Sequence, residues 1–285
     1  MNRRLAPHLA RRAVPVALAC AVALAIPAPA PASAAAMPAS AGRDVSWPQC
    51  GTALPAAASF GVIGVNGGAS FTRNPCLAAQ LGWAKTLARP PAFYANTGDP
   101  GPAYTARWPL GQARPRWCSP QEPNSLACSF DYGWNAGVDA FSAAMDGAQR
   151  LHHYDRATAH RRVANVDWWL DVEILNSWQT LEDAYGPNRA ARERDVAALA
   201  GQIDALWGQG VGRVGIYSTA YQWDAITGGH RITRDWFAAN PAWLAGFSGS
   251  EDAVEGCTYR SFTGGPVLMT QYLGADGLDT DAWCG

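Results

Sequence analysis

Short apolar runs alternate with helical stripes along most of this chain. Runs rich in β-branched and aromatic residues predict strands at residues 42–46, 60–66, 92–96, 165–173, 213–218, 242–247 and 267–272, the last of these closing the series. Apolar residues at helical spacing predict helices at residues 75–88, 131–151 and 189–207, and a helical turn at residues 223–226. Because strands and helices follow one another in this order, we expect a mainly parallel sheet.

Residues 1–36 have the pattern of a secretory signal peptide. Four arginines precede a short apolar run at residues 13–26, and Ala32-Ser33-Ala34 supplies a small-residue cleavage site. The run is shorter than the roughly 20 residues that a transmembrane helix needs. Arg11-Arg12 leaves twin-arginine export open, and Cys20 leaves lipidation open. We expect a secreted protein whose mature chain begins between Ala35 and Ala41.

Removal of the signal peptide changes the charge balance. The whole chain has 22 basic and 23 acidic residues, and the signal peptide contains four of the arginines and no acid, so the remainder has a net charge of −5. This excess of acids gives no electrostatic case for nucleic acid or an anionic membrane as a partner. We expect neither partner, and we expect a monomer.

Cysteine usage agrees with export. Seven cysteines less Cys20 leave an even number in a chain bound for an oxidising compartment. From chain proximity and the expected topology we favour three pairs: Cys50 with Cys76, Cys118 with Cys128, and Cys257 with Cys284. The sequence leaves the other pairings open. A zinc site is the alternative, but the chain has no Cys-x2-Cys spacing.

The remaining residues, 37–285, match the size of a single α/β barrel, and no linker, charge block or internal repeat divides them. In such barrels the reactive residues lie at the carboxyl ends of the strands. Among the 23 acids this rule selects five, two of them after the strand at residues 267–272: Asp44, Asp171, Glu173, Asp279 and Asp281.

Asp171 and Glu173 are two residues apart on one predicted strand, so both side chains project from the same face, with Cα atoms about 6.6 Å apart. Each carboxylate raises the pKa of the other, and burial beside Trp168 and Trp169 acts in the same direction. One protonated and one ionised carboxyl group are what the cleavage of a glycosidic bond requires. In the alternative interpretation Asp171 caps a turn and Glu173 pairs with a surface arginine.

Several motifs occur in an order that resembles the family 25 glycoside hydrolases, the lysozymes that cleave peptidoglycan and have an irregular β/α barrel. The residues that carry the resemblance are Asp44-Val45-Ser46-Trp47-Pro48-Gln49, Asp171-Val172-Glu173, Gly215-Ile216-Tyr217-Ser218, Pro241-Ala242-Trp243-Leu244-Ala245, and Gln271-Tyr272 followed by Asp279-Thr280-Asp281. Together they extend from Asp44 to the end of the chain. The resemblance implies an α/β fold of the irregular TIM-like barrel type, formed as a single domain with disulfides.

The resemblance also implies site residues and a reaction. Glu173 would be the general acid that protonates the leaving oxygen of a β-1,4 bond, and Asp171 would support the reacting sugar. Asp44 and Asp279 would complete the catalytic cluster. The 2-acetamido group of the substrate would be the nucleophile, with direct attack by water as the open alternative.

Polar and aromatic residues at the predicted strand ends are candidates for binding a saccharide. They are Trp47, Gln49, Tyr94, Tyr217, Trp243 and Gln271. Packing is the alternative for the aromatic residues, and bonding to neighbouring backbone is the alternative for the two glutamines.

The chain departs from the family pattern at three places. The second strand ends in Val65-Asn66-Gly67-Gly68, without the charged residues often found there, and Tyr94-Ala95-Asn96 stands where the family has Tyr-His-Phe. Residues 97–129 resemble an insertion relative to a compact family member. A non-catalytic barrel that binds cell-wall glycan or another secreted protein is therefore a second hypothesis, and a hydrolase of another polysaccharide is a third.

Motifs for other chemistries are weak. Gly246-Phe247-Ser248-Gly249-Ser250 lacks the order of a nucleophile elbow, and neither a phosphate-binding loop nor a calcium loop is present in the sequence. His152 and His153 fall near a predicted helix end, where cations suit the helix dipole, with a metal site as the alternative. We expect no cofactor and no metal.

Overall fold

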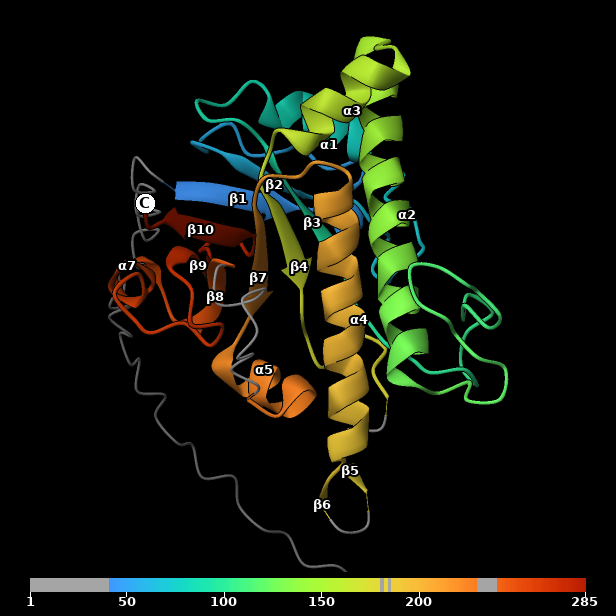
Figure 1. The fold of residues 1–285 in the computed structure, drawn as a ribbon. Coiled ribbons are helices and arrows are strands. Elements are labelled where there is room, and N and C mark those ends of the chain that lie inside the picture. The colour runs from blue at the N-terminus through green and yellow to red at the C-terminus, as the bar shows by residue number, and fades with distance from the viewer. Residues whose placement is uncertain (1–40, 180–181, 184–185, 230–239) are drawn as a thin grey trace, which may run out of the picture. The chain divides into compact units, whose positions relative to one another are not determined.

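The computed structural model describes residues 41–179, 182–183, 186–229 and 240–285. In this part of the chain a closed barrel of eight strands forms the main sheet (Figure 1). The barrel strands are β1 (Ala41–Val45), β2 (Gly61–Gly64), β3 (Ala92–Asn96), β4 (Trp168–Asp171), β7 (Val214–Ser218), β8 (Ala242–Phe247), β9 (Val267–Leu273) and β10 (Asp279–Trp283). A separate two-stranded sheet joins β5 (Glu182–Asp183) to β6 (Gly186–Pro187). The predicted signal peptide, residues 1–36, lies outside the described residues.

Around the barrel the strands follow the order β1-β10-β9-β8-β7-β4-β3-β2. The seven strands β1, β2, β3, β4, β7, β8 and β9 pair in this order, and each pair is parallel. Strand β10 lies between β9 and β1 and is antiparallel to both. The expected α/β barrel with a mainly parallel sheet is therefore confirmed.

The prediction that the strand at residues 267–272 is the last one was wrong. Asp279 and Asp281 belong to β10, which fills the gap between β9 and β1 and gives both strands a hydrogen-bonded neighbour. Its three central residues, 280–282, are buried. The sequence did not predict this strand, because Asp is depleted in strands and the run contains too few apolar residues to form a pattern.

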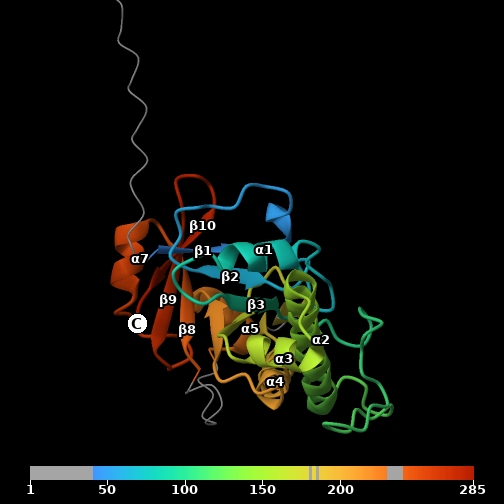
Figure 2. The same cartoon turned by 90° about the horizontal axis from the view of Figure 1, so that it is seen from above.

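The helices are α1 (Leu77–Ala84), α2 (Leu126–His152), α3 (Arg156–Ala164), α4 (Arg189–Gly208), α5 (Ala220–Thr227) and α7 (Ser250–Gly256), with a 3-10 turn, η1, at Trp47–Gln49. Side chains that accept a backbone hydrogen bond cap the starts of α2 and α4: Ser125 binds the amide of Cys128, and Asn188 binds that of Ala191. Helices α2 and α4 run side by side (Figure 1), while α1 lies beside β2 and α7 beside β9 (Figure 2).

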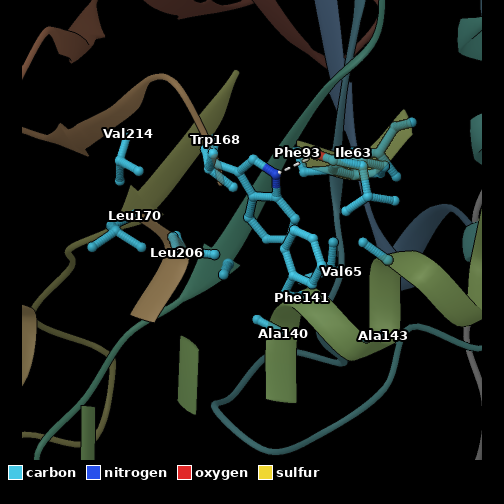
Figure 3. Packing of buried hydrophobic residues seen from close by; sticks show 14 of the residues in the cluster. Ile63, Val65, Phe93, Ala140, Phe141, Ala143, Trp168, Leu170, Leu206 and Val214 are labelled. Carbon is cyan, nitrogen blue, oxygen red and sulfur yellow. Dashed lines mark hydrogen bonds between the residues drawn. The ribbon is translucent and has the colours of Figure 1, made fainter. Parts of the chain in front are cut away.

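Trp168 anchors β4 in the main core. Its side chain is fully buried, and its indole N–H donates to the carbonyl of Val163 at 3.1 Å (Figure 3). Its ring centroid lies 5.2 Å from that of Phe93 on β3 and 5.9 Å from that of Phe141 on α2. This packing fixes the start of β4, so the position of Asp171 at its carboxyl end is fixed as well.

Three disulfides join the pairs favoured from the sequence. Cys50 is bonded to Cys76, Cys118 to Cys128, and Cys257 to Cys284. The last of these ties the residue after α7 to the residue after β10.

Candidate active site

A small cavity of about 110 Å³ lies at the carboxyl ends of the parallel barrel strands. Among the described residues, eight side chains line it: Asp44, Tyr94, Asp171, Glu173, Tyr217, Trp243, Gln271 and Asp279. All four acids expected to be catalytic are among them, together with four of the six residues expected to bind a saccharide.

The pairing of neighbouring strands brings several of these residues to one level of the barrel. Asn96 on β3 is opposite Asp171 on β4, and Asp171 is opposite Tyr217 on β7. Tyr217 is in turn opposite Trp243 on β8. The cavity is therefore a consequence of strand register, because residues far apart in the sequence share one row around the barrel.

Asp171 is almost completely enclosed, with 6% of its surface exposed. The Asn96 side-chain amide donates to its Oδ2 atom, and Asn176 donates to its backbone carbonyl at 2.9 Å. Burial, followed by the nearby Glu173 carboxylate, raises the pKa of Asp171 well above its usual value. Asp171 consequently tends to hold a proton.

Glu173 is half-buried and lies two residues beyond the end of β4. Its backbone carbonyl accepts a hydrogen bond from the indole N–H of Trp178 at 2.7 Å. The residues on either side are also held, since Ser218 donates to the carbonyl of Val172 at 2.7 Å and the amide of Ile174 donates to Gln222 at 2.8 Å. These contacts set the direction in which the Glu173 side chain enters the cavity.

A hydrogen-bonded chain connects the far wall of the cavity to Asp44. The Tyr217 hydroxyl donates to Gln271 Oε1 at 2.8 Å, and Gln271 Nε2 donates to Asp44 Oδ2 at 3.0 Å. Burial, followed by the Asp279 carboxylate, raises the pKa of Asp44 to about 7, although the bond from Gln271 opposes this shift. Asp44 is therefore part of a cluster that can exchange protons near neutral pH.

Asp279 and Asp281 lie two residues apart on β10. Burial raises the pKa of Asp279, while the guanidinium of Arg43 acts in the opposite direction. Asp281 does not line the cavity but is fully buried, and burial with the neighbouring Asp44 and Asp279 carboxylates raises its pKa well above its usual value. Asp281 follows the same strand-end rule as Asp279 and is two residues from it, which is the signal in the sequence that places both acids on one face of β10.

The aromatic residues of the cavity pack against one another. The ring of Trp243 lies 4.6 Å from that of Tyr217 and 6.4 Å from that of Tyr94, measured between centroids. Trp243 is only 2% exposed, so its face is occupied by protein. Burial raises the pKa of both tyrosines, whose hydroxyls therefore remain protonated.

The structure places Trp47 and Gln49 outside this lining. Both belong to the η1 turn after β1, where Gln49 Oε1 accepts the backbone N–H of Ser46 at 2.9 Å. Trp47 is 48% exposed. Gln49 thus satisfies neighbouring backbone, which is the alternative that the sequence left open.

The chemistry of the cavity is that of carboxyl groups. Within the described ranges, no group of three or more His, Cys, Asp or Glu side chains is arranged to hold a metal ion. Several carboxyls that differ in burial and in their hydrogen bonds share one space, which allows one to donate a proton while another is ionised.

Among solved structures, the chain is similar to the bacterial lysozyme from Streptomyces coelicolor, with 17% identity, a TM-score of 0.50, and coverage of 86% of this chain and 92% of that chain. It is also similar to a muramidase from Trichobolus zukalii, with 15% identity and a TM-score of 0.49, and to a family GH25 lysozyme from Aspergillus fumigatus, with 16% identity and a TM-score of 0.48. Each of these two alignments covers 86% of this chain and 93% of the other. No protein-family model matches the chain, and no curated protein matches it. The likeness to the Streptomyces coelicolor structure shows that this chain shares the barrel fold of that lysozyme.

Proposed function

We propose that this chain is a divergent family 25 glycoside hydrolase that cleaves the β-1,4 bonds of peptidoglycan. The observation that carries the proposal is the convergence of Asp44, Asp171, Glu173 and Asp279 in one cavity at the carboxyl ends of the barrel strands. The burial of several carboxylates is costly, and a fold retains such a cluster where proton transfer or charge stabilisation requires it.

In the proposed reaction Glu173 donates its proton to the leaving oxygen as the glycosidic bond breaks. Positive charge then develops on the sugar ring, where the ionised carboxylates of the cluster stabilise it. Asp171, whose raised pKa favours the protonated form, orients the reacting sugar through hydrogen bonds. In one route the 2-acetamido oxygen of the substrate bonds to the anomeric carbon as the leaving group departs; water then attacks that carbon, the bond to the acetamido oxygen breaks, and Glu173 accepts the proton of the water. In the other route water bonds to the anomeric carbon directly after the leaving group has departed, and Glu173 accepts its proton. Both routes restore the starting state of Glu173.

Secretion is part of the same proposal. It is supported by the signal pattern at residues 1–36 and by the three disulfides, which persist in oxidising compartments. None of the described helices has the length and apolar character needed to cross a bilayer.

The assignment of Glu173 is tested by Glu173→Gln, which keeps the shape of the side chain but removes the proton donor. We expect at least a hundredfold loss in the release of reducing ends from purified peptidoglycan, as is typical when a general acid is removed. Glu255→Gln, at an exposed position on α7, is the matched control and should retain wild-type activity. Equal activity of Glu173→Gln and the wild type would refute the role.

One observation favours a second candidate function, a non-catalytic barrel that binds glycan. The cavity volume of about 110 Å³ is smaller than the roughly 300 Å³ or more of most ligand pockets. Binding of peptidoglycan by the wild type, without release of reducing ends at any pH tested, would select this candidate.

A further inference from the structure

A second and larger cavity, of about 620 Å³, lies beside the loop that follows β4. Residues 97–129 supply one wall, the loop at residues 176–179 a second, and the first turns of α4 a third. The side chains that matter here are Tyr104, Asn124, Asn176, Trp178, Gln179 and Arg194.

Gln179 organises the base of this second cavity. Its Nε2 atom donates to Asp99 Oδ2 at 2.9 Å, and its Oε1 atom accepts from Arg194 Nε at 2.7 Å and from Asn124 Nδ2 at 3.0 Å. Gln179 is 8% exposed and Asp99 is fully buried. Polar groups from three segments are therefore held in fixed positions before any ligand arrives.

The charge of Arg194 is partly offset by Asp99, since both side chains are bonded to Gln179. Burial raises the pKa of Asp99 to about 6, while Arg194 acts in the opposite direction, so Asp99 is mainly ionised at neutral pH. An anionic ligand would meet this carboxylate as well as Arg194. The cavity is thus better matched to a neutral polar ligand, for which amide and guanidinium groups supply hydrogen bonds.

Aromatic rings complete this lining. Tyr104 lines this cavity and is 85% exposed, so its ring is open to contact by a ligand. Trp178 is half-buried and fixed by the hydrogen bond from its indole to the Glu173 carbonyl. Aromatic faces together with amide side chains suit a sugar, which presents C–H faces and hydroxyl or N-acetyl groups.

The loop at residues 173–179 connects the two cavities. Glu173 lines the first, while Asn176, Trp178 and Gln179 line the second. The first cavity, of about 110 Å³, is small beside a polymeric substrate, so contacts beyond it are needed to hold such a substrate in place.

We propose that the second cavity is an accessory saccharide-binding subsite, which takes a neutral N-acetylhexosamine unit of the glycan at a distance from the cleaved bond. It rests on the proposed function for the identity of the glycan. Residues 97–129 serve in this proposal as a wall of the substrate path.

The test is binding of the tetramer of N-acetylglucosamine, measured by titration calorimetry on the Glu173→Gln protein so that cleavage does not interfere. Tyr104→Ala and Asn124→Ala should each weaken binding about tenfold. Trp117→Ala, an exposed aromatic side chain of residues 97–129 outside the cavity lining, is the matched control and should bind as the parent does.

Unchanged affinity in both Tyr104→Ala and Asn124→Ala, or equal loss in Trp117→Ala, would overturn the subsite. Weakened binding in the two variants supports it even if the wild type releases no reducing ends, in which case only the hydrolytic proposal fails. The reverse result, hydrolysis by the wild type with unchanged tetramer affinity in the variants, removes the subsite and leaves the hydrolase.

Discussion

Asp281 is a fully buried acid on β10, next to the carboxyl groups of Asp44 and Asp279. None of its surface is accessible to water. Burial raises the pKa of Asp281, and the negative charges of Asp44 and Asp279 raise it further. An acid in this position is stable only in its protonated form. The folded protein therefore binds a proton at Asp281 that the unfolded chain releases at a lower pH.

The consequence is a stability that falls as pH rises. Because the folded-state pKa of Asp281 is raised above the unfolded value of 3.8, its contribution is fully present below that value and is lost as pH rises through the folded pKa. Asp281→Asn should flatten the pH dependence of the free energy of unfolding, by up to about 1.4 kcal/mol per pH unit. Urea denaturation at about pH 5 and about pH 8 measures this, and an unchanged difference between the two pH values would contradict it.

The sequence predicted which acids line the cavity, but it did not predict the side chains that form hydrogen bonds to them. Asp44, Asp171, Glu173 and Asp279 followed from a rule about strand ends, which needs only the order of elements. The contact of Asn96 with Asp171 depends on the register between β3 and β4, which apolar runs do not specify to one residue.

The contact between α2 and α4 depends on glycines. A Cβ atom added to Gly133 on α2 would lie 1.8 Å from the carbonyl oxygen of Ala198, and one added to Gly201 on α4 would lie 2.0 Å from that of Phe130. The two helix backbones therefore approach more closely than any side chain at these positions allows. The same approach sets the place of Arg194 beside the second cavity.

Gly133→Ala should consequently destabilise the protein by about 3 kcal/mol or more, since the new methyl group meets backbone that cannot move without separating the helices. Gly208→Ala in α4 is the control, because its nearest neighbour is a Trp134 side-chain atom at 3.4 Å. Alanine favours a helix over glycine, so this control should leave stability equal or slightly higher. Thermal denaturation of the two variants distinguishes the outcomes, and similar melting temperatures would argue against the close contact.

Elements with clear apolar patterns were predicted with the bounds that the structure has, as for β3 and β8. Helix α3 was missed because only Ala159, Val163 and Ala164 are buried in it, and the charged remainder obscures the stripe. Strand β10 was missed because two of its five residues are Asp, which is depleted in strands. Asp279 lines the cavity and Asp281 is buried, so both residues are exceptions to the usual strand composition.

Across the whole molecule the disulfides close loops of different lengths. Cys257–Cys284 spans 27 residues and joins α7 to β10, whereas Cys118–Cys128 spans 10 residues outside the barrel. The chain-entropy model gives about 3.5 kcal/mol for the longer loop and about 2.7 kcal/mol for the shorter.

Replacing both cysteines of a pair by serine tests this difference. Loss of Cys257–Cys284 should lower the free energy of unfolding more, and should also reduce hydrolytic activity, because β10 carries Asp279. Loss of Cys118–Cys128 should cost less stability. Denaturant titration and peptidoglycan digestion of both double variants provide the measurements, and the opposite ranking of stability would contradict the expectation.

The pairing of β1 with β10 makes the cavity a late product of folding. Asp44 comes from the first barrel strand and Asp279 from β10, so neither the ring of strands nor the cluster of acids exists until β10 has emerged. A chain whose β10 has not yet left the ribosome or the export channel has open edges on β1 and β9 in place of a site. Under the proposed function, such an incomplete chain has no hydrolytic activity, because Asp279 has not yet joined Asp44.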